Sequence, residues 1–445
     1  MKTLKAVVLA AGEGRRLRPL TLTRPKHMIQ IGGRPLLEYH LLSLRDAGIR
    51  EILLVVNYKS AQIKNYFEDG SKLGVKIEYI YQKELKGTAD AFSLAEDYVD
   101  GDFLATYGDL LITPNVVRSA LDTHLKTTPA ATLTTVEVEH PEHYAVVKSA
   151  QKRVVEISEK PPPALITSKK VNAGVYVFSP KIFGAIKQTG SSPRGEREIT
   201  DSIRLLIEKD EKIIAAEISP EDWLDVGRPW DLLDANKQVL KHLKPKVLGK
   251  IEEGAHIEGP VFVEEEVRIR SGTYIEGPAY IGRESDIGPN CYIRPYTSIG
   301  RRTRIGNGVE VKNSILMDDV HVGHLSYIGD SIIGKHCNFG AGTITANLRF
   351  DGKPIEMKIK DETVSTGRRK MGIVMGDYVQ VGVGVLFMPG VKVGCNSWIG
   401  PNIVVYKDVP SNTVMILQQQ IRSTSFRRET RKDNKSPMRN KTRLI

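Results

Sequence analysis

Residues 275–317 read IEGPAYIGRESDIGPNCYIRPYTSIGRRTRIGNGVEVKNSILM, with an aliphatic residue or methionine at every sixth position. The same spacing reaches back to Ile251, so that twelve such positions stand in register from Ile251 to Met317. A six-residue period fits neither an α-helix nor a hairpin. It is typical of a parallel β-helix, in which each coil is a triangle with one inward side chain per side. We therefore predict a β-helix domain over residues 245–415.

The period is interrupted twice. It slips near Gly323, resumes at Ile328, and after residues 345–374 runs again from Met375 to Val405. Residues 345–374 are therefore expected to leave the prism as a loop. Such loops often carry function, although a simple insertion is the other interpretation. His324 follows the slip, so we expect its side chain to stand where an inward corner is absent.

Residues 1–244 have a different pattern, in which buried strands alternate with amphipathic helices. Alternation of this kind predicts an α/β domain with a doubly wound, mostly parallel, Rossmann-like sheet. Pro245 is expected to end the last helix and the domain. The predicted strands are 4–10, 51–56, 76–81 and 102–107, and the predicted helices are 36–48, 60–70, 88–99, 113–125 and 229–243.

Composition indicates a reduced, cytoplasmic protein. The 445 residues include three cysteines with no Cys-x-x-Cys pair, which argues against a disulfide framework or a structural zinc site. No apolar run is long enough for a membrane helix, and the N-terminus lacks a signal-peptide pattern.

The net charge of +11 is concentrated at the C-terminus, where residues 422–445 hold nine basic and two acidic residues. We predict that residues 416–445 form a disordered, solvated tail. A non-specific contact of this tail with nucleic acid or another polyanion is the alternative; otherwise we expect neither a nucleic-acid nor a membrane partner.

The first predicted strand runs into a glycine-rich turn that carries many cations. Gly12 and Gly14 are accompanied by five basic residues, Arg15, Arg16, Arg18, Arg24 and Lys26. Backbone N–H groups in such a turn can approach phosphates closely, and the cations would neutralise them. This combination favours a nucleoside triphosphate site.

The stretch LAAGEGRRLRPLTLTRPK (9–26) closely resembles the signature of sugar-1-phosphate nucleotidylyltransferases, and the resemblance extends over the whole first domain. It implies nucleotide contacts from Ala10, Ala11, Gly12, Gly14, Gln82, Gly87 and Thr88. It implies sugar-phosphate contacts from Gly108, Glu159, Lys160 and Asn172. It also implies an Mg²⁺ site at Asp109 and Asp225, with Arg15 and Lys26 as the catalytic cations.

The chemistry agrees with these residue types. A sugar phosphate must attack the α-phosphorus of a nucleotide, and both partners are anions. Catalysis therefore needs positioning and charge neutralisation rather than a protein nucleophile. Two carboxylates provide the hard oxygen ligands that Mg²⁺ prefers.

The segments VGHLSYIGD (322–330) and NFGAGTITANLRFDGK (338–353) resemble the acetyltransferase half of the bifunctional N-acetylglucosamine-1-phosphate uridyltransferase/glucosamine-1-phosphate acetyltransferase family, of the archaeal type. The resemblance implies a left-handed β-helix that assembles as a homotrimer, with each site between adjacent subunits. His324 would be the general base. Amino-sugar phosphate contacts would come from Arg294, Lys312, Tyr327 and Asn338, and acetyl-CoA contacts from Ala341 and Asn347.

Departures from the bacterial pattern leave some questions open. The cluster Arg368, Arg369 and Lys370 is a candidate phosphate or coenzyme A contact, and a longer loop would move Lys353. The start of the chain is closer to glucose-1-phosphate thymidylyltransferases, so dTTP competes with UTP as the expected donor.

We therefore expect a bifunctional enzyme that acetylates glucosamine-1-phosphate from acetyl-CoA and then forms UDP-N-acetylglucosamine and pyrophosphate from UTP. The first alternative is a single-activity glucose-1-phosphate uridylyl- or thymidylyltransferase whose β-helix is a scaffold. The second is a non-enzymatic regulatory homologue, against which Lys26, Asp109 and Asp225 argue.

Overall fold

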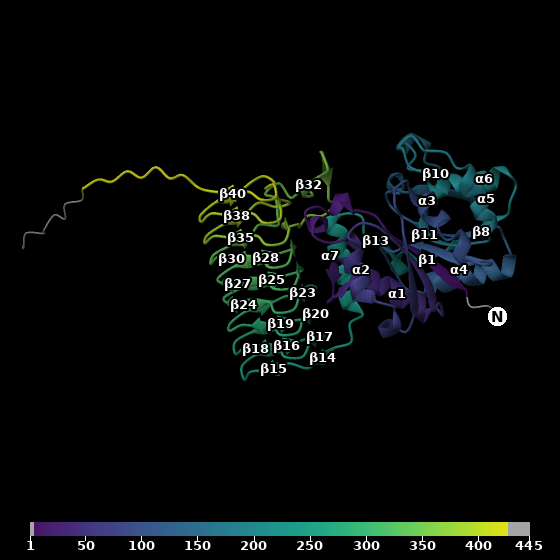
Figure 1. Cartoon of the computed structure of the whole chain (residues 1–445). Helices are drawn as coiled ribbons and strands as arrows, with labels where there is room; N and C mark the ends of the chain where they lie inside the picture. Colours follow the sequence, from purple (N-terminus) through teal and green to yellow (C-terminus); the bar gives the residue numbers. More distant parts are fainter. Residues whose placement is uncertain (1–3, 426–445) are drawn as a thin grey trace, which may run out of the picture.

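The computed structural model describes residues 4–425. These residues form two domains that lie side by side, an α/β domain and a prism built of short strands (Figure 1). Within these residues no helix is long and apolar enough to cross a membrane. The three cysteines are buried and unbridged. Residues 416–425 are exposed and carry no regular structure, and the rest of the predicted tail lies outside the described residues.

The α/β domain is built on one nine-stranded sheet, which confirms the predicted doubly wound fold. Four parallel neighbours form its first half, in the order β5 (Lys76–Tyr81), β4 (Glu51–Val56), β1 (Lys5–Ala10) and β6 (Phe103–Tyr107). The second half contains antiparallel pairs and continues with β11 (Lys170–Phe178), β8 (Ala131–Glu137), β12 (Ile213–Glu217), β10 (Arg153–Glu159) and β9 (Ala145–Ala150).

Of the seven α-helices among the described residues, five lie close to their predicted positions, and those at Lys181–Gln188 and Ile199–Glu208 were not predicted. The seven are α1 (Leu36–Asp46), α2 (Ser60–Phe67), α3 (Thr88–Ser93), α4 (Pro114–Thr127), α5 (Lys181–Gln188), α6 (Ile199–Glu208) and α7 (Pro229–Lys241). The segment 88–99 does not form one helix, because α3 ends at Ser93 and a separate 3₁₀ turn covers Glu96–Tyr98. Two short ribbons complete the domain: β2 (Gln30–Ile31) with β3 (Arg34–Pro35), and β7 (Leu110–Ile112) with β13 (Trp223–Asp225).

The second domain is a parallel β-helix with three faces, as the six-residue period predicts. The first face contains β14 (Lys246–Val247), β17 (Val261–Val263), β20 (Ala279–Ile281), β23 (Thr297–Ile299), β26 (Ile315–Leu316), β29 (Ile332–Ile333), β34 (Val374–Met375) and β37 (Lys392–Val393). The second contains β15 (Lys250–Ile251), β18 (Arg268–Ile269), β21 (Asp286–Ile287), β24 (Arg304–Asn307), β27 (His321–His324), β30 (Asn338–Phe339), β35 (Gln380–Val381), β38 (Trp398–Ile399) and β40 (Val414–Met415). The third contains β16 (His256–Glu258), β19 (Tyr274–Glu276), β22 (Tyr292–Ile293), β25 (Glu310–Lys312), β28 (Tyr327–Gly329), β31 (Ile344–Thr345), β36 (Leu386–Phe387) and β39 (Val404–Val405).

The structure corrects the predicted register near the end of the first run. Leu316, not Met317, stacks on Ile299 and faces the β-helix core, so the step from Val311 to the next inward residue is five rather than six. Met317 instead packs against the α/β domain. Val322 is fully buried inside the prism, so no inward corner is missing before His324. The expectation that His324 occupies a gap in the core was wrong.

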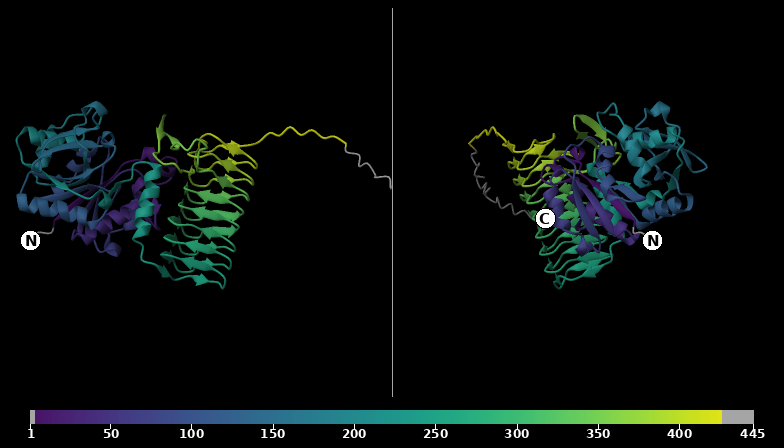
Figure 2. Two further views of the ribbon diagram at one scale, coloured as in Figure 1. Left: turned by 180° about the vertical axis from the view of Figure 1, so that it is seen from behind. Right: turned by 45° about the vertical axis from the view of Figure 1, so that its right-hand side comes forward.

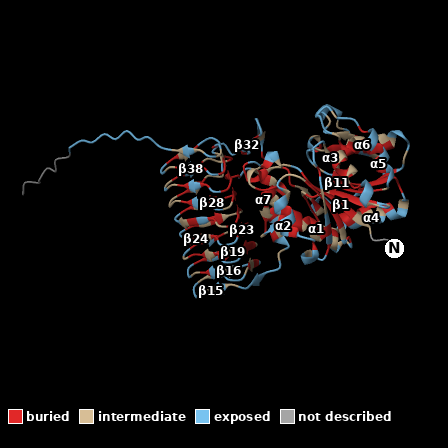
Figure 3. Cartoon of the chain, viewed as in Figure 1, coloured by how far each residue is buried: buried red, intermediate tan, exposed pale blue. Residues whose placement is uncertain are grey.

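An apolar interface joins the two domains. Side chains from the first face of the prism and from the excursion after Thr345 pack against Leu17, Leu20, Ile29, Val226 and Trp230. The excursion forms a hairpin of β32 (Glu356–Ile359) and β33 (Glu362–Ser365), whose Met357 and Ile359 are buried in this interface. Figures 1 and 2 show α7 lying along the prism, and Figure 3 shows buried residues on the side of the prism that faces the α/β domain.

Candidate active sites

The loop of residues 12–26, which we call the signature loop, folds back on itself between β1 and β2. Gly14 has a φ of 63°, and a Cβ atom added there would lie 2.9 Å from the Cβ of Lys26. Only glycine fits that position, because the left-handed backbone and the close approach both exclude a side chain. Gly12 has open space at its Cβ position, which leaves its backbone free to approach a ligand.

The signature loop ends at a part-buried ion pair. Lys26 Nζ donates to Asp109 Oδ2 at 2.6 Å, and only 8% of Lys26 is exposed. Burial by itself would raise the pKa of Asp109, but the charge of Lys26 holds that pKa below its usual value. Asp109 is therefore an anion that stands where β6 ends, as the sequence predicts.

Asp225 lies beside this pair. β13 and β7 are antiparallel neighbours, and their register puts Asp225 opposite Leu110, the residue after Asp109. Burial raises the pKa of Asp225 above its usual value, although the charge of Lys26 opposes this effect and only the like charge of Asp109 adds to it. Within residues 4–425 the Asp225 carboxylate accepts no hydrogen bond and forms no ion pair. Asp109 is thus neutralised by Lys26, whereas Asp225 beside it has no direct partner and is the carboxylate that a bound cation would pair with.

The two arginines at the start of the signature loop differ. Arg15, the predicted catalytic residue, is mostly exposed and pairs with Glu13 at 2.5 Å. Arg16 was expected among the five cations of the turn but was given no catalytic role. Its Nη1 lies 3.6 Å from the Cβ position of Gly227, which is also 3.6 Å from Asp225 Oδ2. No sequence feature distinguishes Arg16 from Arg15, because only the folded loop shows which one faces the carboxylates.

The predicted base-reading residues come together at the start of α3. Gln82 is buried and donates to Asp90 Oδ2 at 3.0 Å. Gly87 has a φ of 116°, and a Cβ there would stand 2.3 Å from the carbonyl oxygen of Arg197. The Thr88 hydroxyl accepts from the Ile199 amide at 3.0 Å, so α6 holds this turn in place.

The predicted sugar-contacting residues line β10 and β11. Glu159 accepts from Arg194 at 3.0 Å and from Thr200 at 3.3 Å, and burial raises the pKa of Glu159. Burial also lowers the pKa of the adjacent Lys160. Asn172 donates to the Tyr176 hydroxyl at 2.6 Å. Arg194 was missed from the sequence because its loop, 191–196, resembles an ordinary polar turn.

Gly108 lies in the chain between the end of β6 and Asp109. Its amide donates to the Leu9 carbonyl at 2.9 Å, and a Cβ there would lie 3.0 Å from that oxygen. Ala10, the last residue of β1, and Ala11, which follows it, are buried. The three small residues let the two strand ends lie close together at the floor of the site.

In the β-helix, the candidate amino-sugar residues gather around a carboxylate that the sequence reading did not assign. Asp330 is buried and accepts from Lys312 at 3.0 Å, from Asn313 at 2.7 Å and from Asn347 at 2.5 Å. Asn347 also donates to the Tyr327 hydroxyl at 3.1 Å. Asp330 ends the quoted segment VGHLSYIGD, so its place in that motif was the available signal.

Arg294 lies one coil below this cluster. Its Nη1 donates to Glu310 at 2.9 Å, while its buried Nε has no hydrogen-bond partner among the described residues. A buried guanidinium donor without a partner is costly. It therefore marks a place where an anionic group would be accommodated.

The other predicted acetyltransferase residues stand apart from this cluster within one chain. His324 is exposed at the end of β27, and Asn338 is exposed on the neighbouring strand β30. Ala341 is partly buried in the turn that follows β30. His324 precedes β28 and Asp330 follows it, so the two lie at opposite ends of that strand.

The three residues of the basic cluster in the excursion, Arg368, Arg369 and Lys370, differ in their surroundings. Arg368 donates to Asp234 of α7 at 2.6 Å, which ties the excursion to the α/β domain. Arg369 and Lys370 are exposed. Lys353, also exposed, donates its backbone amide to Asp351 at 3.2 Å.

A nucleotidyltransferase-type domain joined to a β-helix defines a two-domain transferase. A family model described as nucleotidyl transferase matches residues 5–242, and one described as GMPPB C-terminal domain matches residues 275–387. A solved structure of a UDP-glucose pyrophosphorylase can be aligned with this chain. The alignment covers 54% of this chain and 98% of that chain, with a TM-score of 0.50 and 24% sequence identity, which indicates a shared fold.

Curated relatives specify the family. The chain is 44% identical over 419 residues to the bifunctional protein GlmU of Methanocaldococcus jannaschii, covering 94% of this chain and 98% of that protein. It is 41% identical over 411 residues to a bifunctional sugar-1-phosphate nucleotidylyltransferase/acetyltransferase of Sulfurisphaera tokodaii, covering 91% of this chain and 98% of that protein. The chain belongs to this family of bifunctional GlmU proteins.

Proposed function

We propose that the β-helix acetylates glucosamine-1-phosphate from acetyl-CoA, and that the α/β domain then transfers UMP from UTP to the product. One observation carries the proposal: each domain has a part-buried lysine–carboxylate pair among its predicted substrate-binding residues, Lys26 with Asp109 and Lys312 with Asp330. Two clusters in separate domains suit two reactions on phosphorylated sugars. They do not suit one active site with an inert scaffold.

Magnesium fits the first cluster. Asp109 and Asp225 offer oxygen ligands, and within residues 4–425 only Asp109 of the two forms a side-chain hydrogen bond, to Lys26. Their number suits Mg²⁺, which keeps waters and binds through one or two carboxylates plus phosphates. When bound, the ion would supply positive charge to the phosphates of nucleotide and sugar.

The chain's own residues would do the rest of nucleotidyl transfer. A phosphate oxygen of the sugar attacks the α-phosphorus of UTP, and the bond from that phosphorus to the bridging oxygen breaks, releasing pyrophosphate. Lys26 and Arg15 would stabilise charge on the transferring and leaving phosphates. Gln82 and the backbone at Gly87 would hold the uracil, and Glu159 and Asn172 would orient the sugar.

Acetyl transfer would use the second cluster. The sugar amine attacks the thioester carbonyl, the carbon–sulfur bond breaks, and coenzyme A leaves as its thiol after taking a proton. His324 would accept the proton that the amine loses. Lys312 and Arg294 would bind the sugar phosphate, Tyr327 and Asn338 the sugar, and Ala341 and Asn347 the acetyl-CoA end of the site.

We further propose a homotrimer that works in the cytoplasm. His324 and Asp330 lie at opposite ends of β28, so a neighbouring subunit is needed to bring a base to the amino-sugar cluster. Large apolar side chains on the prism support such contacts, because Leu325 is 65% and Trp398 59% exposed. Light scattering should give a mass of three chains or a multiple. A monomer that still acetylates would refute the trimer.

The proposed pair of activities is tested by supplying amino-sugar phosphates with acetyl-CoA and measuring free thiol. Glucosamine-1-phosphate should release thiol faster than galactosamine-1-phosphate. Pyrophosphate release from UTP or dTTP with N-acetylglucosamine-1-phosphate measures the second reaction, and UTP should be the better donor. If pyrophosphate is released but no amino-sugar phosphate gives free thiol, the proposed acetyl transfer is refuted. The chain would then be a nucleotidylyltransferase with a scaffold β-helix.

A further inference from the structure

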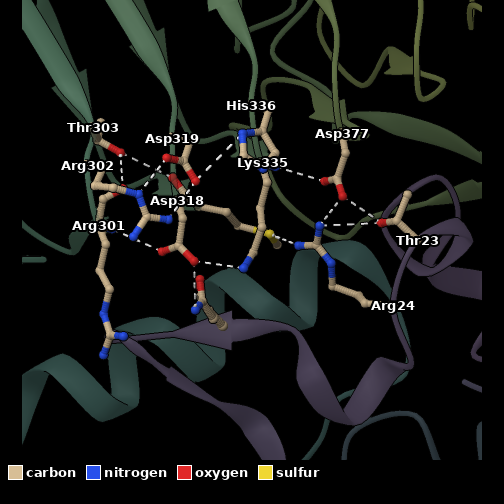
Figure 4. Close-up of polar contacts among 12 residues, drawn as sticks. Thr23, Arg24, Arg301, Arg302, Thr303, Asp318, Asp319, Lys335, His336 and Asp377 are labelled. Atoms are coloured by element: carbon tan, nitrogen blue, oxygen red, sulfur yellow. Dashed lines mark hydrogen bonds and ion pairs between the residues drawn. The ribbon is translucent and has the colours of Figure 1, made fainter. Parts of the chain in front are cut away.

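The signature loop is held from both domains. On the α/β side, Thr21 Oγ1 donates to the Gly14 carbonyl at 2.9 Å and the Tyr58 hydroxyl donates to the Thr21 carbonyl at 2.9 Å. On the other side, the middle of the loop rests on the β-helix. Thr23 Oγ1 donates to Asp377 Oδ2 at 2.7 Å, and the Arg24 guanidinium pairs with the same oxygen. Figure 4 shows Thr23 and Arg24 pointing at Asp377.

The contact is buried on both sides. Arg24 is 4% and Asp377 3% exposed, so water does not compete for the pair. The second guanidinium nitrogen of Arg24 contacts the Met317 sulfur, also from the β-helix. Arg24 therefore finds its hydrogen-bond partners mainly outside its own domain.

Asp377 is itself fixed by the regular coils of the prism. It stands in the turn after β34, and its Oδ1 accepts the Lys335 amide of the coil below at 2.8 Å. Asp318 occupies the equivalent turn of a lower coil and accepts the Arg301 amide at 3.0 Å. Asp318 is similarly buried but bonds to Gln30 and Lys335, not to the signature loop.

Only Pro25 separates Arg24 from Lys26, whose ammonium is bound to Asp109. Proline has a fixed φ, so a displacement of Arg24 passes to Lys26 with little backbone freedom to absorb it. Misplacing a catalytic group by about 1 Å can lower a rate by about 100-fold.

We propose that Asp377 of the β-helix is a positioning residue for nucleotidyl transfer, because it anchors Arg24 and thereby places Lys26. This inference rests on the proposed nucleotidyl transfer. It adds that the β-helix serves both reactions, its own through the Lys312 cluster and the other domain's through Asp377. No part of Asp377 needs to touch substrate for this role.

The test compares full-length Asp377→Asn with the matched control Asp318→Asn. Both changes remove one buried charge from equivalent turns, and asparagine can keep the bond to the backbone amide below. In Asp377→Asn, kcat for nucleotidyl transfer should fall at least about tenfold while KM for UTP changes less than about twofold. Asp318→Asn should retain the wild-type kcat. Arg24→Lys, which keeps a cation for Asp377, should lose less activity than Arg24→Met.

Loss of folded protein is separated from loss of positioning by the ratio of the two activities. A smaller folded fraction would lower thiol release and pyrophosphate release by the same factor, whereas misplacement of Lys26 would lower only pyrophosphate release. An unchanged ratio in Asp377→Asn, or an equal change in Asp318→Asn, would overturn the inference. A wild-type protein that releases no pyrophosphate would instead refute the proposed function.

Discussion

Lys26 and Asp109 meet through a 2.6 Å hydrogen bond although 83 residues separate them in the chain. The bond brings the end of the signature loop to the end of β6, and the register of β13 on β7 adds Asp225 to the same place. Charge of both signs is thus concentrated where two anionic substrates would react.

Asp225→Ala should abolish nucleotidyl transfer and leave acetyl transfer unchanged. The substitution removes one of the two proposed metal carboxylates, and we expect pyrophosphate release to fall by at least about 10²–10³-fold. Asp222→Asn is the control, since Asp222 lies on the same segment and bonds to Thr113 instead. Loss of both activities in a folded Asp225→Ala protein would contradict the two-site account.

Lys312→Ala should weaken binding of glucosamine-1-phosphate. A hydrogen bond to a charged group is worth about 1.5–3 kcal/mol, so KM for the sugar phosphate should rise about 10- to 100-fold in the thiol-release assay. Lys335→Ala is a matched control, because Lys335 forms a similar pair with Asp318 elsewhere on the prism. An unchanged KM in Lys312→Ala would remove Lys312 from the site.

His324→Ala should lower the acetylation rate by about 10²–10⁴-fold and spare nucleotidyl transfer to N-acetylglucosamine-1-phosphate. His321→Ala controls for the loss of an exposed histidine from the same strand. A His324→Ala protein that releases thiol as fast as the wild type would show that His324 is not the base.

His40 should make the stability of the α/β domain depend on pH. The ring is fully buried, Nδ1 lies 3.0 Å from the Leu110 carbonyl, and burial lowers the pKa of His40 to about 4. The unfolded chain takes up this proton near pH 6.5, whereas the folded chain does so near pH 4. The neutral His40 ring therefore stabilises the folded state fully above pH 6.5, and this stabilisation is lost as the pH falls towards 4.

His40→Gln should reduce that acid sensitivity. Between pH 6 and 4.5 the wild type should lose about 1.4 kcal/mol of unfolding free energy per pH unit through this group, and the variant should lack that component. Denaturant titrations at several pH values, monitored at the α/β domain, measure the difference. Equal slopes for the two proteins would contradict the assignment.

Sequence alone predicted the architecture because its signals are local or periodic. The six-residue spacing defines the prism, and strands such as 51–56 carry continuous apolar runs. The register error arose at Met317, because one step of five residues occurs from Val311 to Leu316. Leu316 and Met317 are adjacent and both apolar, so the sequence does not show which of them faces the prism core.

The site could be predicted only where residues sit in recognisable motifs, as Asp109 and Lys312 do. Asp330 has the central position in its cluster, but its contacts with Asn313 and Asn347 depend on the stacking of coils. Arg24 and Asp377 form a pair although they are 353 residues apart, and no local sequence pattern around either residue predicts this contact. Such long-range polar contacts arise from the packing of domains.

The most direct test of a bifunctional enzyme with separate sites is complementation between two inactive variants. Asp225→Ala and His324→Ala are each incubated with glucosamine-1-phosphate, acetyl-CoA, UTP and Mg²⁺, alone and mixed, and UDP-N-acetylglucosamine is quantified. Neither variant alone should form it at more than a small fraction of the wild-type rate. The mixture should form it readily, since N-acetylglucosamine-1-phosphate made by Asp225→Ala can diffuse to His324→Ala. Product from His324→Ala alone at the wild-type rate, or a mixture as inactive as its components, would contradict the account.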